Sequence, residues 1–290
     1  YVAGLIGVCG MLVDYHIHLE RAGISRANAM RFLDRALAHG ISEIAFTEHA
    51  YNFVECAAML NRPGYVSKHG HGFRLDDYVS LVCQMKAEGL PVKLGIEFDY
   101  IDETIEDVAD FLEEGHPWDL VIGSVHWIEE WGFDIDAGSW ANVDAEWAYS
   151  MYFERACRAA RCGVFDVLGH PDVIKVFGAR LPAGPAASGR YEGYCDALAS
   201  AASASGTCLE VSSAGLRRPA REAYPAVALL RRAHKRGVGI TLASDAHEPE
   251  EVGSGYEELV AWARMAGYSN VNTFDGRIAT DVRIGRGSTE

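Results

Sequence analysis

The sequence lacks several features that would each indicate a different class of protein. Its seven cysteines include no Cys-x-x-Cys pair, and their odd number and wide spacing argue against both a disulfide framework and a thiolate zinc site. No apolar run approaches the roughly 18 residues that a membrane-spanning helix needs. The first ten residues are apolar but carry no basic start, so they make a poor signal peptide. We therefore expect a cytoplasmic protein with no membrane segment.

Positive charge is also scarce. The chain has 26 lysines and arginines against 41 acidic residues, a formal net charge of −15. Because non-specific nucleic-acid binding depends on clustered cationic side chains, we expect no nucleic-acid partner. A small anionic substrate is compatible with this charge, and bound divalent cations would offset part of it.

What the sequence does contain is a regular alternation of β-prone runs and helical segments. We expect strands at 11–15, 41–46, 92–96, 120–124, 164–168, 207–211 and 238–243, and helices at 26–39, 75–88, 102–114, 141–162, 191–204, 221–236 and 256–266. A late apolar piece, 271–274, is a candidate terminal strand. Seven β-then-α units predict a parallel sheet, either open and doubly wound or closed into a barrel. At 290 residues we expect one domain over 11–290, with 1–10 as a leader outside the fold.

Histidines mark the ends of the expected strands. Six of them follow a β-prone run: His16, His18, His49, His126, His170 and His247. Glu97 and Asp245 occupy equivalent positions, whereas the other five histidines fall in helix ends or loops. One such histidine is more often a hydrogen-bonded residue than a ligand, but nearly every strand contributes one here. Barrel enzymes gather catalytic residues at the carboxyl ends of their strands, whereas an open sheet concentrates them at one switch point. We therefore predict a closed barrel with a multinuclear metal site.

The spaced segments that carry these residues resemble the PHP (polymerase and histidinol phosphatase) family. They run in the family's order: Asp14-Tyr-His-Ile-His18, Thr47-Glu-His49, Gly95-Ile-Glu97, Ser124-Val-His126, Gly169-His170-Pro171 and Ser244-Asp-Ala-His247. Further segments, 98–101, 213–217 and 252–253, look like the histidinol-phosphatase branch. The resemblance implies an α/β fold of one domain, a distorted (β/α)7 TIM-like barrel that holds two to three divalent ions of zinc, manganese or iron.

The resemblance also implies how the ligands are shared. His16, His18, Glu97 and Asp245 would hold a first ion, and Glu97 would bridge to a second ion on His126 and His170. His49 and His247 would hold a third. Relatives usually place another histidine six residues after the His-x-His pair, where this chain has Ile24. We expect Glu20 to replace that ligand and to favour Mn²⁺ or Fe²⁺, the alternative being a rim carboxylate beside a weak or absent third ion.

These residues predict a phosphatase whose nucleophile is a hydroxide that bridges two metal ions, because cations lower the pKa of bound water to ~7. Asp245 would handle the proton, His247 would assist the leaving alkoxide, and Arg217 would bind the phosphate through its planar guanidinium. The resemblance implies a small phosphorylated substrate, L-histidinol phosphate, and a place in histidine biosynthesis. Alternatives are a phosphatase or cyclic phosphodiesterase acting on sugar phosphates or nucleotides, and a catalytically silent regulatory barrel. The sequence does not indicate an oligomeric state.

Overall fold

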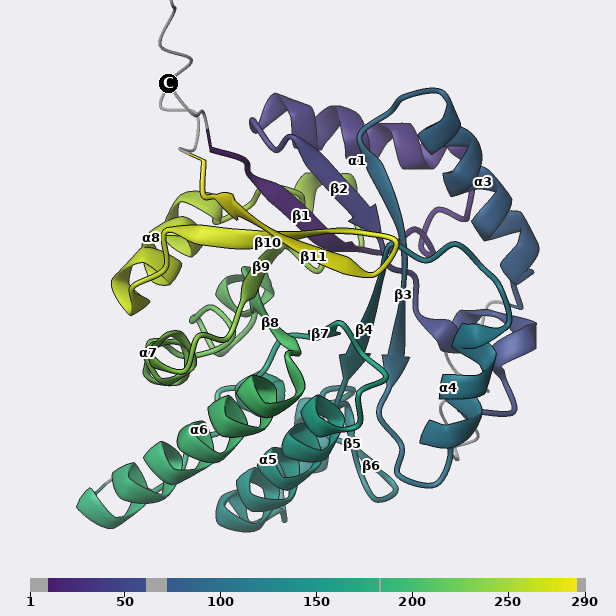
Figure 1. Cartoon of the computed structure of the whole chain (residues 1–290). Coiled ribbons are helices and arrows are strands. Elements are labelled where there is room, and N and C mark those ends of the chain that lie inside the picture. The colour runs from purple at the N-terminus through teal and green to yellow at the C-terminus, as the bar shows by residue number, and fades with distance from the viewer. Residues whose placement is uncertain (1–9, 61–71, 183, 286–290) are drawn as a thin grey trace, which may run out of the picture.

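The structure is a computed structural model that describes residues 10–60, 72–182 and 184–285. Strands and helices alternate along most of the chain (Figure 1). The strands are β1 (Val13–Ile17), β2 (Glu43–Phe46), β3 (Val92–Asp99), β4 (Leu120–Ser124), β5 (Trp127–Ile128), β6 (Trp131–Gly132), β7 (Val167–Leu168), β8 (Cys208–Ser212), β9 (Ile240–Ala243), β10 (Asn270–Asp275) and β11 (Ile278–Arg283). The helices are α1 (Arg26–Ala38), α3 (Leu75–Ala87), α4 (Ile105–Glu113), α5 (Ala145–Arg161), α6 (Pro185–Ser205), α7 (Val227–Lys235) and α8 (Tyr256–Ala266).

Seven of the strands form one parallel sheet in the order β1-β2-β3-β4-β7-β8-β9. The ring is completed just beyond β9, where Ala246 pairs with Ile17 of β1 and its carbonyl accepts the His18 amide at 2.8 Å. The helices lie outside the strands (Figure 1). The predicted (β/α)7 TIM-like barrel is therefore confirmed.

The strands are apolar on both sides because the barrel interior and the helices bury both faces. Every residue of β1, β4, β8 and β9 is buried. These strands contain few charged residues. Asp14 and His16 lie on β1, and Glu210 lies on β8. Buried charge is costly unless it is paired or binds a metal, so these positions mark a functional end of the barrel.

Several helices begin later or earlier than the sequence predicts. Helix α7 begins at Val227 instead of residue 221, because Tyr224 precedes Pro225 and instead exchanges backbone hydrogen bonds with Ser212. Helix α6 begins at Pro185 instead of residue 191, with proline at the first helical position, where its missing N–H costs nothing. The connection that leads into this helix is therefore shorter than the sequence predicts.

The chain ends in an antiparallel hairpin, β10 and β11, of which only the first strand is expected from the sequence. Its turn contacts the amino-terminal ends of the barrel strands: the Arg277 amide donates to the Asp119 carbonyl at 2.8 Å, and Arg277 Nε lies 2.9 Å from Asp166 Oδ2. Met11 also pairs with Ile284 next to β11. The hairpin thus covers the end of the barrel opposite the carboxyl ends of the strands.

Residues 1–9 of the expected leader lie outside the described part of the chain, as do His69 and His71. Among the helices that the structure does describe, none combines the length and the apolar character that a membrane span requires.

Candidate metal centre

The predicted ligands meet at the carboxyl ends of the barrel strands. His16 and His18 are two residues apart on β1 and its extension, so both rings point to the same side. His16 Nε2 lies 3.3 Å from Glu97 Oε2, and His18 Nε2 lies 3.4 Å from Asp245 Oδ1. The first predicted ligand group is therefore assembled around one point.

Glu97, on β3, lies at the middle of the cluster with its two oxygens facing different histidines. Oε2 lies near His16 and His49, while Oε1 lies 3.3 Å from His170 Nε2 and accepts a hydrogen bond from Ser124 Oγ. A carboxylate with this arrangement can bridge two ions.

Unsatisfied polar atoms test whether the residues fit a metal. Among the described residues, Glu97 Oε2, His16 Nε2 and both ring nitrogens of His18 are buried without a hydrogen-bond partner. Buried polar groups nearly always have a partner, and a divalent cation would supply one for all of them. Imidazole nitrogens and carboxylate oxygens are also the donors that Zn²⁺, Mn²⁺ and Fe²⁺ accept. The residues therefore fit a divalent metal centre.

A second ligand group lies on the other side of Glu97. His126 Nε2 and His170 Nε2 face each other at 3.3 Å, and the other nitrogen of His126, Nδ1, lies 2.7 Å from Asp99 Oδ1. Asp134 Oδ2 approaches His126 Nε2 at 4.0 Å. The two facing nitrogens and Glu97 Oε1 match the predicted second site.

The third predicted group contains His49, His247 and Glu20. Ring nitrogens of His18, His49 and His247 come within 4.8 Å of one another, and so do ligand atoms of His18, Glu20 and Glu48. Glu20 Oε1 lies 3.7 Å from His247 Nε2, while its Oε2 is buried without a hydrogen-bond partner among the described residues. The structure thus brings Glu20 to the edge of the cluster, beside the histidines it was expected to join.

Carboxylates behind the ligands orient their rings. Glu210 Oε2 lies 2.7 Å from His16 Nδ1, and Asp99 holds Nδ1 of His126 in the same way. Glu48 accepts the backbone amides of Leu19 and His49 at 2.7 and 3.0 Å. Such contacts fix the tautomer and direction of a ligating histidine. Glu210 is not among the residues that the strand ends predict, although a lone acidic residue within the apolar run of β8 is a signal that could identify it.

The charges of the cluster shift the pKa values of its groups in different directions. Burial would lower the pKa of three histidines, but neighbouring carboxylates raise the pKa of His16 well above its usual value and those of His18 and His126 to about 10. Burial alone would raise the pKa of Glu97, but His49 and His16 hold it well below its usual value. Burial, together with the charge of His18, lowers the pKa of His247 well below its usual value, and His49 is lowered for the same reasons. Glu97 is therefore ionised, and a cation that binds the cluster would displace the protons of the histidines whose pKa is raised, because only a neutral imidazole ligates a metal.

Two of the predicted ligands have a strained backbone conformation. His170 has φ +24° and Asp245 has φ +53°, in the left-handed region that residues other than glycine rarely occupy. Each such residue costs about 1–3 kcal/mol, and such strain gathers at functional sites. Both side chains lie within the cluster. The position of each side chain is therefore kept although its backbone conformation costs stability.

A cavity of about 340 Å³ opens above the cluster. It is lined by Arg21, His49, Tyr51, His126, Asp134, Ile135, His170, Arg218, Asp245 and His247. Arg217, predicted to bind phosphate, instead donates from Nη2 to the carbonyls of Ser244 and Asp245 at 2.8 and 3.2 Å. The guanidinium of Arg217 therefore supports the Asp245 segment, and Arg218 lines the cavity.

The chain is similar to known proteins over most of its length. Residues 14–214 match the model of the PHP domain, and residues 229–262 match the model described as PHP-associated. A probable histidinol-phosphatase of Deinococcus radiodurans is 32% identical over 266 residues, covering 88% of this chain and 94% of that protein. A histidinol-phosphatase of Lactococcus lactis is 23% identical, covering 91% and 94%.

Solved structures show the same fold. The histidinol phosphate phosphatase of Lactococcus lactis, crystallised with zinc, L-histidinol and phosphate, superposes with a TM-score of 0.71 at 22% identity, covering 93% of this chain and 98% of that one. The corresponding Listeria monocytogenes protein gives 0.69 at 19% identity, covering 85% and 99%. The match to the family model over residues 14–214 and the relative at 32% identity together show that this chain belongs to the PHP domain family.

Proposed function

We propose that this protein is a divalent-metal-dependent phosphomonoesterase that hydrolyses L-histidinol phosphate to L-histidinol and phosphate, a step of histidine biosynthesis. The observation that carries the proposal is the buried cluster in which Glu97 faces two groups of histidines. The substrate is supported by the Deinococcus radiodurans relative, named a probable histidinol-phosphatase, which aligns with 88% of the chain.

The cluster would hold two to three divalent ions. His16, His18, Glu97 and Asp245 would form the first site, and Glu97 with His126 and His170 the second. His49, His247 and Glu20 would form the third. Ions held there supply Lewis-acid stabilisation of phosphoryl oxygens and make a bound water acidic. The chain's own residues then have to bind the phosphate, orient the substrate and accept a proton.

Asp245 is our proposed proton acceptor. Burial would raise its pKa, but its contact with His18 and the nearby charge of His16 hold that pKa well below its usual value, so the carboxylate is ionised. His247 is neutral, and its Nδ1 lies 3.2 Å from the Asp245 carbonyl, an arrangement that leaves Nε2 directed toward Glu20. This favours His247 as a ligand of the third ion. Where His247 is not held by that ion, its ring is our proposed contact for the leaving oxygen.

Arg218 is our proposed phosphate contact. It lines the cavity above the cluster together with Arg21, and a guanidinium can hold two phosphate oxygens at once. For Arg217 to bind phosphate as the sequence predicts, its guanidinium would have to leave the carbonyls of Ser244 and Asp245. We propose that Arg217 positions Asp245 while Arg218 meets the substrate.

Hydrolysis of a substrate panel tests the proposal, measured by phosphate release for the monoesters and by chromatography of the ring-opened product for the cyclic phosphates. The protein, stripped by chelation and reloaded with Zn²⁺, Mn²⁺ or Fe²⁺, would be assayed with L-histidinol phosphate, cyclic ribose phosphates and nucleoside 3′,5′-bisphosphates. We expect the highest kcat/KM with L-histidinol phosphate and loss of activity in the chelated protein. A higher kcat/KM for a cyclic phosphate or a nucleotide would contradict the proposed substrate. Inactivity with every compound and every metal would contradict the proposal that the protein is an enzyme.

A further inference from the structure

His170 is held differently from two other predicted ligands, His16 and His126. Glu210 Oε2 lies 2.7 Å from Nδ1 of His16. Asp99 Oδ1 lies at the same distance from Nδ1 of His126. In contrast, Nδ1 of His170 is buried and has no hydrogen-bond partner among the described residues. Since a ligating histidine is normally oriented through its second ring nitrogen, the direction of the His170 ring depends on its backbone instead.

The backbone around His170 has an unfavourable conformation. His170 has φ +24°, and Asp172, two residues later, has φ +76°. His170 also precedes Pro171, which restricts its backbone further. Residues other than glycine persist in the left-handed region only where the surrounding structure holds them. The contacts that hold this short segment therefore determine where the His170 ring points.

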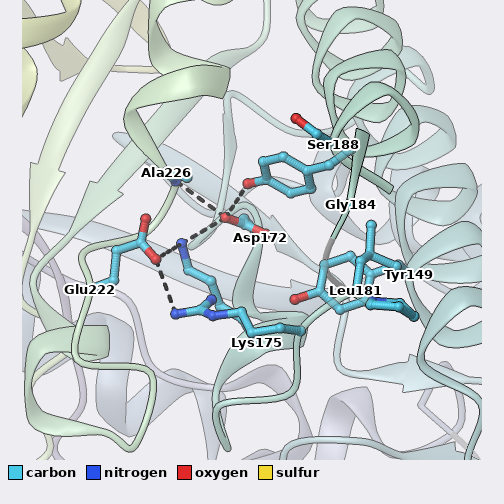
Figure 2. Close-up of a pocket in the computed structure, with 11 residues that line it drawn as sticks. Tyr149, Asp172, Lys175, Leu181, Gly184, Ser188, Glu222 and Ala226 are labelled. Atoms are coloured by element: carbon cyan, nitrogen blue, oxygen red, sulfur yellow. Dashed lines mark hydrogen bonds and ion pairs between the residues drawn. The ribbon is translucent and has the colours of Figure 1, made fainter. Parts of the chain in front are cut away.

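Hydrogen bonds from several elements anchor Asp172. Its Oδ2 accepts hydrogen bonds from Lys175 Nζ at 2.7 Å, from Tyr191 OH of α6 at 2.7 Å and from the Ala226 amide at 3.2 Å (Figure 2). Its own amide donates to Tyr152 OH of α5 at 2.9 Å. Helices α5 and α6 and the residue that precedes α7 thus fix the chain at the point where it leaves the metal centre.

The anchor includes a buried ion pair. Asp172 and Lys175 are both almost fully shielded from solvent, and Lys175 Nζ also lies 3.4 Å from Glu222 Oε2 (Figure 2). Because both charges lose their hydration, a buried pair often stabilises a fold no more than apolar side chains of similar size do. Its charge-assisted hydrogen bonds nevertheless impose a defined geometry. The pair therefore suits a role in positioning better than a role in stability.

We infer that Asp172 is a positioning residue for His170. Its network of hydrogen bonds holds the chain so that His170 Nε2 faces Glu97 Oε1 and His126 Nε2, each at 3.3 Å. Asp172 itself lies outside the proposed ligand groups and outside the lining of the metal cavity. The inference rests on the proposed metal centre, and it names the residue on which the affinity of the second ion depends.

Zn²⁺ binding tests this role. Competition with a chelator measures the affinity of each Zn²⁺ ion for the stripped protein, and the binding step that disappears in His126→Ala belongs to the second ion. Asp172→Gly removes the anchoring side chain at a φ that glycine adopts freely. We expect this variant to bind the second ion about tenfold to a hundredfold more weakly, because the His170 ring is no longer held toward it. The first ion should keep its affinity.

Two milder variants separate positioning from folding. Asp172→Asn keeps an oxygen acceptor and tolerates the left-handed conformation, so it should weaken second-ion binding less than Asp172→Gly does. Tyr191→Phe removes one hydrogen bond to Asp172 and no charge, and it should shift the affinity in the same direction. Tyr191 is only partly buried, so this variant keeps the test decisive if Asp172→Gly does not fold.

Asp119→Asn is the matched control. Asp119 is also a buried carboxylate that pairs with a lysine, Lys86, and its Oδ2 accepts the Leu94 amide at 2.8 Å. It lies at the amino-terminal end of the barrel, away from the proposed ligands. Urea denaturation should therefore show a loss of stability in Asp119→Asn, as in Asp172→Asn, while its affinities for both Zn²⁺ ions equal those of the parent.

The inference is overturned if Asp172→Gly and Tyr191→Phe bind the second Zn²⁺ as tightly as the parent does. It is also overturned if Asp119→Asn weakens second-ion binding as much as Asp172→Asn does, because the effect would then follow from lost stability alone. A parent protein that binds only one Zn²⁺ contradicts the proposed metal centre and this inference with it. Since binding is measured and not turnover, a wrong substrate assignment leaves the result unaffected.

Discussion

At the scale of single residues, Glu97 is the central residue of the proposed metal centre. A buried carboxylate is costly unless its oxygens are satisfied, and Glu97 Oε2 has no hydrogen-bond partner in the described structure. Its two oxygens face the ligand groups of two proposed ions. Removal of this one side chain should therefore affect both sites, whereas removal of His126 or of His18 should affect one.

We predict that Glu97→Ala loses two metal ions together. Elemental analysis of the purified variant should show that two ions fewer are bound per chain than in the parent. Glu88→Ala is a suitable control, because Glu88 only pairs with Arg26 at the surface. Full metal occupancy in Glu97→Ala would mean that Glu97 does not bridge.

The two neighbouring arginines should behave differently. Arg218→Ala should raise KM for the phosphate ester by roughly tenfold to a hundredfold, the effect of losing about 1.5–3 kcal/mol, with metal content unchanged. Arg217→Ala should instead lower kcat, because Arg217 holds the Ser244 and Asp245 carbonyls. Steady-state kinetics and metal analysis distinguish the two. A rise in KM with Arg217→Ala and none with Arg218→Ala would show that Arg217, and not Arg218, binds the phosphate.

Glu20 gives a test of the third ion. If its carboxylate is a ligand, Glu20→Gln should weaken third-ion affinity, measured by competition with a chelator, and Glu20→His should shift the preference toward zinc. Glu248→Gln is a control at an exposed carboxylate of the rim. Equal metal stoichiometry and rate in Glu20→Gln and the parent would show that Glu20 is a rim residue and that the centre holds two ions.

The sequence predicts residues of this site whose position follows from the ends of strands. It does not predict the direction in which a long side chain points. His16, His18, Glu97, His126 and His170 meet because parallel strands end at the same side of a barrel. The direction of Arg217 depends on a side-chain torsion and on the carbonyls of Ser244 and Asp245, which no spacing reveals. Adjacent arginines look equivalent in sequence, yet only Arg218 of this pair lines the cavity.

At the scale of elements, apolar runs located the seven barrel strands but not all helix ends. Strand β4 agrees with its expected bounds of 120–124, whereas α5 begins at Ala145 and not at residue 141. The reason is Asp144, whose side chain caps the helix and so fixes its first turn. The hairpin strand β11 was missed because most of its residues are exposed and lack an apolar period.

We predict that Asp144→Ala destabilises the protein by about 1 kcal/mol, the usual cost of losing an N-cap. Asp144 Oδ1 accepts the amides of Glu146 at 2.7 Å and Trp147 at 3.2 Å, and both would be left without this partner. Urea denaturation measures the change. Asp144→Asn, which can still accept these hydrogen bonds, should lose much less, and an equal loss in both variants would contradict the capping role.

At the scale of the whole molecule, the barrel assigns separate tasks to its two ends. The carboxyl ends of the strands carry the proposed metal ligands, and the amino ends are covered by the β10–β11 hairpin through Asp119 and Asp166. The alternation of strands and helices alone leaves an open sheet and a closed barrel equally possible. The ring of ligands favoured the barrel, and the pairing of Ala246 with Ile17 shows how the ring is completed.

This separation predicts that Arg277 matters for stability and not for catalysis. Its guanidinium makes a two-pronged contact with Asp166 and donates to the Val164 carbonyl at 2.6 Å. Arg277→Ala should therefore lower the free energy of unfolding by about 1.5–3 kcal/mol, measured in urea. The exposed Arg283→Ala on β11 should change it by less than about 0.5 kcal/mol. Arg277 is at the far end of the barrel from Glu97. The kcat/KM and the metal content of folded Arg277→Ala should therefore equal those of the parent. A loss of either would mean that the two ends of the barrel are coupled.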